Sequence, residues 1–151
     1  ISPTTTLAQR VESLPTALEG VGVDEHPGAI PPLDLAFRDH HAKPVKLGDF
    51  FHRGRPVILT LNYSNCPMLC NLQLSGLVEG LRGIDWNAGT EFDVVSVSID
   101  PLETPERAAV TQQRYLQHYG RPGTGDGWHF LVGRPAEIDA LAQSIGFEYR
   151  Y

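Results

Sequence analysis

The sequence has 151 residues and a formal net charge of −6, with acidic and basic residues mixed along the chain. This pattern excludes a nucleic-acid surface, which needs clustered Lys and Arg to neutralise phosphates. The length and a hydrophobic content of 41% fit one globular domain, and no apolar run reaches the roughly 18 residues that span a bilayer.

The two ends of the sequence predict the domain organisation. Residues 1–29 are rich in Thr, Pro, Gly and Ala, which indicates an irregular arm ahead of a domain over residues 30–151. Because the sequence begins at Ile1 without methionine, we expect a targeting segment or membrane anchor outside it. It stops within the alternating pattern FEYRY, so we also expect the domain's C-terminal strands and helix to be missing from it.

The first predicted elements are strands. Leu33, Leu35 and Phe37 alternate with polar or small residues over 33–39, which predicts a half-buried strand. A turn and a second short strand follow, so a β-hairpin precedes the main fold. Residues 56–62, PVILTLN, are almost all apolar or β-branched, as is typical of a central strand buried on both faces.

A strand–helix–strand unit comes next. The helix after residue 62 has one apolar face, made by Leu74, Leu77, Val78 and Leu81. Residues 91–100 predict a second central strand, so we expect a right-handed parallel crossover.

The last third of the chain predicts two more helices and a third strand. Thr104, Pro105 and Glu106 mark a helix start, and this helix runs to about Tyr119. Residues 128–132 predict a strand, and residues 135–146 a helix that Gly146 ends.

Both cysteines of the chain, Cys66 and Cys70, lie in NYSNCPMLCN between the first central strand and its helix. In open α/β sheets, ligands bind outside the carboxyl ends of the strands, and a helix N-terminus favours the reactive thiolate. Residues four apart share one helix face, so the two thiols can converge.

Two converging thiolates form a reversible disulfide or bind a soft metal ion. Cu(I) suits two thiolates and an imidazole, whereas Zn(II) normally takes a fourth ligand. The alternative is that both thiols are core residues, because free Cys is among the most buried types. We favour a disulfide or metal site over core packing, because both thiols follow the carboxyl end of a central strand, where ligands bind in such sheets.

The segment VKLGDFFHRGRPVILTLNYSNCPMLC resembles the thioredoxin-like superfamily. The motif CPMLC, followed about thirty residues later by DP and a TPE helix start, resembles the Sco/SenC family of copper-binding assembly factors. The similarity extends over residues 28–151. It implies an α/β thioredoxin-like fold with central parallel strands and flanking helices.

The resemblance also implies a function. Members bind copper, as Cu(I) or Cu(II), through two cysteines and a histidine, and Cys66 and Cys70 match the two thiol ligands. They build the dinuclear copper centre of cytochrome c oxidase, by delivering copper or by reducing that centre's cysteines. The expected partners are the oxidase subunit with this centre and other copper carriers, and the expected location is periplasmic or otherwise extracytoplasmic, tethered to a membrane through an anchor outside this sequence.

The histidine ligand implied by the resemblance lies beyond Tyr151, so no histidine of the chain inherits that role. His129 lies in a strand pattern and is expected to be a core or sheet residue. The other five are expected to be solvated: His26 in the arm, His40 and His41 in the hairpin turn, and His52 and His118 near helix ends.

Three residues in or near the cysteine segment are expected to have structural roles rather than chemical ones. Asp100 precedes a proline and is expected to be a turn residue, Pro67 restrains the cysteine loop, and Met68 is apolar cover for the site.

The alternative function is a thiol–disulfide reductase, in which one of the two cysteines attacks and the other resolves. A thioredoxin-like peroxidase is less favoured. Such enzymes place Thr three residues before the reactive cysteine, and here that residue is Tyr63.

Overall fold

The computed structural model describes residues 21–63 and 69–149, and for residues 69–71 it describes the backbone alone. A five-stranded sheet in the order β3-β2-β6-β5-β4 forms its centre. In chain order the strands are β2 (Ala36–Asp39), β3 (Pro44–Lys46), β4 (Val57–Asn62), β5 (Asp93–Ser98) and β6 (Trp128–Val132).

The central strands follow the predicted pattern. β4, β5 and β6 are parallel, and β2 and β3 form the predicted antiparallel hairpin. All six residues of β5 are buried, as expected for a strand covered on both faces. β2 also pairs with β6 and covers one side of the parallel core, while β4 has no partner strand on its outer side among the described residues.

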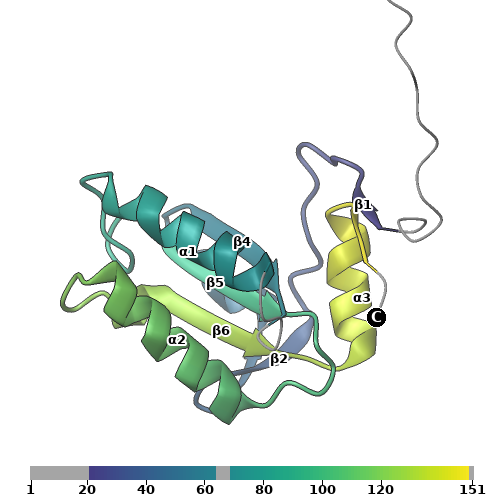
Figure 1. Ribbon diagram of the computed structural model, residues 1–151. Coiled ribbons are helices and arrows are strands. Elements are labelled where there is room, and N and C mark those ends of the chain that lie inside the picture. Colours follow the sequence, from purple (N-terminus) through teal and green to yellow (C-terminus); the bar gives the residue numbers. More distant parts are fainter. Residues whose placement is uncertain (1–20, 64–68, 150–151) are drawn as a thin grey trace, which may run out of the picture.

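Helices cover both faces of the sheet. Figure 1 shows α1 (Leu69–Arg82) and α2 (Pro105–Tyr119) side by side on one face. They pack on buried residues such as Val94 and Phe130. On the other face, α3 (Pro135–Ser144) and the 3-10 turn η2 (Leu47–Phe50) enclose a second core cluster with Val95, Val97 and Leu131.

The ends of α2 lie where the sequence predicts them. Thr104 is the N-cap, and its Oγ1 accepts a hydrogen bond from the Arg107 N–H at 3.3 Å. Pro105 is the first helical residue. Gly120 ends the helix in the left-handed region, with φ of 69°. A second short 3-10 turn, η3 (Gly125–Gly127), leads from this end into β6.

A separate two-stranded ribbon joins the two ends of the described chain. β1 (Gly22–Val23) pairs antiparallel with β7 (Phe147–Glu148), and the Asp24 N–H donates to the Gly146 carbonyl at 2.7 Å. Two residues of the predicted irregular arm therefore form a strand. The division into an arm over 1–29 and a domain over 30–151 stays a prediction. None of the described helices combines the length and the apolar character that crossing a membrane requires.

Candidate functional site

The predicted site lies where β4 ends and α1 begins. β4 ends at Asn62, and Cys70 is the second residue of α1. Cys66, Pro67 and Met68 lie outside the described residues, as does the side chain of Cys70. The first turn of α1 contains no acidic residue, so the positive end of its dipole is not neutralised from within the helix. A thiolate at this end is electrostatically favoured.

A polar network crosses from β4 to β5 next to this junction. Ser96 Oγ accepts hydrogen bonds from Thr60 Oγ1 at 2.9 Å and from Asn62 Nδ2 at 2.8 Å. The Asn62 side chain lies in the core, since the residue is only 2% exposed. Its Oδ1 has no hydrogen-bond partner in the described chain, so the end of β4 carries an open, buried acceptor.

The end of β5 is tied to the end of β4. The Ile99 N–H donates to the Asn62 carbonyl at 2.7 Å, which keeps the two strand ends together. Asp100 then makes a tight turn, because its Oδ1 accepts the Leu102 N–H at 2.8 Å and its carbonyl accepts the Glu103 N–H. This is the turn role that the sequence predicts for Asp100.

Glu103 places a second open acceptor at the start of α2. Its side chain is fully buried, and its Oε1 lies 3.3 Å from Arg107 Nε. The Oε2 atom has no partner among the described residues. Buried acceptors without donors are rare in folded proteins, and among the described residues one lies at the end of β4 and one just before α2.

The histidines of the described chain lie mostly where the sequence places them. His129 is in β6 with 13% of its side chain exposed, as predicted for a sheet residue. His26, His41, His52 and His118 are exposed. His40 differs from the expectation, because it is half-buried and contacts β6. Within the described residues, no three His, Cys, Asp or Glu side chains lie close enough to hold a metal ion.

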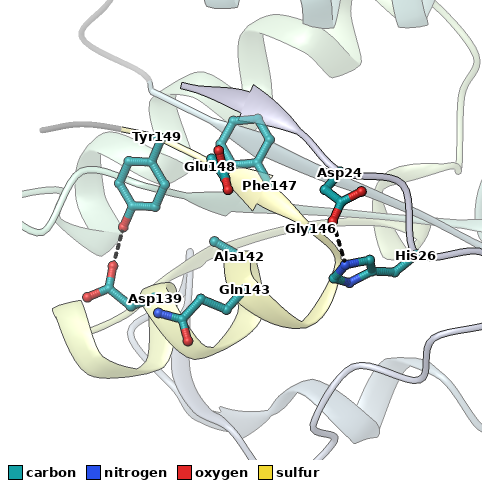
Figure 2. Close-up of a pocket in the computed structure, with 9 residues that line it drawn as sticks. All are labelled: Asp24, His26, Asp139, Ala142, Gln143, Gly146, Phe147, Glu148 and Tyr149. Carbon is teal, nitrogen blue, oxygen red and sulfur yellow. Dashed lines mark hydrogen bonds and ion pairs between the residues drawn. The ribbon is translucent and has the colours of Figure 1, made fainter. Parts of the chain in front are cut away.

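A polar pocket of about 420 Å³ lies between the β1–β7 ribbon and α3. Figure 2 shows Tyr149 and Asp139 on one side of it, joined by a 2.7 Å hydrogen bond, with Asp24 and His26 on the other. Burial, and then the hydrogen bond to Asp139, raises the pKa of Tyr149 to about 12. None of the lining residues comes from β4 or β5, so the pocket is not part of the predicted cysteine site.

A comparison with models of known protein families identifies the family of this chain. The SCO1/SenC family model matches residues 33–151. The chain belongs to the SCO1/SenC family.

A curated member of the family is similar to this chain in sequence. The chain is 30% identical over 97 residues to "Protein SCO1 homolog 1, mitochondrial" of Arabidopsis thaliana. The aligned residues make up 64% of this chain and 26% of that protein. The chain therefore spans about a quarter of that SCO1/SenC relative.

Solved structures show the same fold. A protein of Aquifex aeolicus VF5 has a TM-score of 0.65 at 24% identity, covering 82% of this chain and 73% of that one. Bradyrhizobium japonicum ScoI, solved with copper bound, has a TM-score of 0.53 at 25% identity, covering 78% of this chain and 66% of that one. The predicted thioredoxin-like α/β fold of the SCO1/SenC family is confirmed.

The polar residues shared by β4 and β5 were not predicted from the sequence. Thr60 and Asn62 interrupt the apolar strand PVILTLN, and Ser96 interrupts VVSVS. These interruptions were the available signal, because a polar residue in a strand buried on both faces needs a hydrogen-bond partner.

Proposed function

We propose that this SCO1/SenC chain is a copper-binding assembly factor for the dinuclear copper centre of cytochrome c oxidase. Cys66 and Cys70 are its two thiolate ligands. The observation that carries the proposal is the position of the chain's only two cysteines at the β4–α1 junction, inside the segment that the family model matches. The copper bound to Bradyrhizobium ScoI supports copper as the metal.

The chemistry of the donors fits Cu(I). Two thiolates are soft ligands, and the N-terminal end of α1 favours their ionised form. The third ligand in this proposal is the histidine that the family resemblance implies beyond Tyr151. Copper is the cargo of the protein, and the receiving partner is the copper-centre subunit of the oxidase. We place the protein outside the cytoplasm, anchored to a membrane through a segment outside this sequence.

The test is an anaerobic Cu(I) titration against a chromophoric competing ligand. The wild-type protein is expected to bind one Cu(I) per chain, and Cys66→Ser and Cys70→Ser are each expected to lose that binding. Binding should also weaken in acid, because protons compete for the thiolates. His41→Gln is the matched control, since it removes an exposed imidazole and should leave binding unchanged. Wild-type affinity in both serine variants would rule the proposal out.

The second candidate is a thiol–disulfide reductase that acts on the cysteines of the oxidase copper site. The unneutralised N-terminus of α1 favours it equally, because a thiolate is also the attacking species in disulfide exchange. Equilibration of the metal-free protein with thiol buffers of known potential separates the two. A potential too oxidising to reduce the partner's disulfide leaves copper binding as the function.

A further inference from the structure

The β2–β3 hairpin is attached to β6 partly through a side chain. The backbone ladder pairs Arg38 with Val132 and Asp39 with Leu131, and it ends there. The next pair in this register is His40 and Phe130. At this position the Phe130 N–H donates to His40 Nδ1 at 3.4 Å, so an imidazole nitrogen takes the place of a backbone carbonyl.

The hairpin turn fixes where this imidazole lies. Asp39 Oδ1 accepts hydrogen bonds from the His41 and Lys43 N–H groups, both at 2.9 Å. The Asp39 N–H donates to the Lys43 carbonyl at 3.0 Å, and Ala42 closes the turn with φ of 61°. The backbone on both sides of His40 is therefore held, and the ring contacts that of His41 at a centroid distance of 4.2 Å.

A cavity of about 630 Å³ lies under the hairpin, between η2, β6, η3 and Gln112 in the middle of α2. It is at the amino end of the parallel strands, because His129 in its wall is the second residue of β6. The cysteine junction is at the opposite, carboxyl end of the parallel strands. The hairpin forms one side of the cavity.

His129 shows that this region does not accommodate an added positive charge easily. Its ring packs on Phe50 at 4.5 Å, and its Nε2 lies 3.7 Å from Asp93 Oδ1, beyond hydrogen-bond distance. Asp93 is already paired with Arg55 through two bonds of 2.6 and 2.9 Å. The carboxylate nearest to His129 is therefore already paired with a guanidinium.

The charged and titratable groups around His40 come from every element that packs against it. They belong to the hairpin, to η2 and the residues that follow it, and to η3, β5 and β6. These groups are Asp39, His41, Lys43, Asp49, Arg53, Asp126, Asp93 and His129. Burial lowers the pKa of His40 and His41 lowers it further, while Asp39 and the contact with the Phe130 backbone act in the opposite direction without reversing the net change. Burial also lowers the pKa of His129 to about 4; Asp93 opposes this change, and Arg53 and His40 reinforce it.

We propose that His40 is a pH-sensitive clasp, whose unprotonated Nδ1 holds the β2–β3 hairpin on β6 and whose protonation releases the hairpin and opens the cavity beneath it. A protonated Nδ1 has no lone pair for the Phe130 N–H, so acid removes this bond directly. The clasp is independent of the proposed copper function.

The direction of the pH effect follows from the lowered pKa. A released hairpin leaves the imidazole in water with an ordinary pKa near 6.5, so protons bind the released form more tightly than the closed one. The clasp's contribution to closure is complete above this ordinary value. It is lost as the pH falls through the lowered pKa of the closed form.

The test is amide hydrogen exchange of Phe130 measured by NMR at about pH 7 and about pH 5, the range in which histidine titrates. Each rate is divided by the intrinsic rate of an unprotected amide. In the wild-type protein the protection of Phe130 should fall at least several-fold in acid, while amides of the central strand β5 keep theirs. The β5 amides report global unfolding, which a released hairpin alone does not cause.

Two substitutions at position 40 separate the clasp from a general effect of acid. In His40→Asn, the side-chain oxygen can accept the same N–H but does not titrate, so protection should remain at both pH values. In His40→Leu, protection should be low at both. The proposal is overturned if wild-type protection does not depend on pH, if His40→Asn loses protection in acid like the wild type, or if His41→Asn alone abolishes the dependence.

Discussion

Asn62 and Ser96 lie on neighbouring parallel strands and are joined by a hydrogen bond of 2.8 Å from Asn62 Nδ2 to Ser96 Oγ. Thr60 donates to the same Ser96 oxygen at 2.9 Å. Thr60 and Asn62 share the face of β4 that carries Ile58, which packs in the core under α1 and α2. The network therefore fixes the sheet beneath the start of α1.

Replacing Ser96 should weaken the fold. Ser96→Ala leaves the donors of Thr60 and Asn62 without their shared acceptor, and an unsatisfied buried group costs about 1–3 kcal/mol. We expect the free energy of unfolding to fall by about that amount in a urea titration. Thr60→Val is the matched control, because it removes one donor and leaves the Asn62–Ser96 bond in place. An equal loss in both variants would show that the network is not the cause.

The Arg55–Asp93 pair is expected to be much more costly to break than a surface pair. Asp93 is completely buried and its carboxylate is held by Arg55 at 2.6 and 2.9 Å. Arg55→Met leaves that charge without its partner, which typically costs about 3–5 kcal/mol of unfolding free energy. Urea unfolding at neutral pH measures the loss.

The control for this pair is Arg82→Met. Arg82 binds Glu79 at 3.2 Å with both side chains at least half exposed, so we expect a change of no more than about 1 kcal/mol. Adding Asp93→Asn to Arg55→Met should restore part of the stability, since the buried charge is then gone. No recovery in the double variant would contradict the electrostatic explanation.

Gly146 is expected to hold the β1–β7 ribbon in place. It has φ of 70°, and a Cβ there would overlap the carbonyl oxygen of Asp24. Gly146→Ala should therefore detach β1, with loss of exchange protection at the Asp24 amide and a cost above about 2 kcal/mol. Gly28→Ala tests the backbone strain alone, because Gly28 has φ of 82° and open space around it. Equal effects of the two substitutions would argue against the steric explanation.

The sheet and the helices were predictable because each has a strong local signal. β6 coincides with the predicted residues 128–132, and α2 begins after Thr104 and ends before Gly120 as its caps require. β4 and β5 are the two apolar, β-branched runs. These features depend on neighbouring residues, so one sequence is enough to identify them.

The remaining features depend on contacts between residues far apart in the chain. The pairing of β1 with β7 joins two-residue strands, too short for any periodicity. The half-buried state of His40 results from the way β2 lies along β6. For the site, the sequence placed both cysteines at the end of a central strand, but the network of Thr60, Asn62 and Ser96 became visible only in the register of β4 and β5.

The most direct test of the copper-binding proposal is X-ray absorption at the copper edge of the Cu(I)-loaded protein. If Cys66 and Cys70 are the ligands, the spectrum of the wild type should show two sulfur atoms bound to copper, and Cys70→Ser should show at most one. A copper site without sulfur ligands, or one with two sulfur ligands in Cys70→Ser, would contradict the assignment of the cysteine pair.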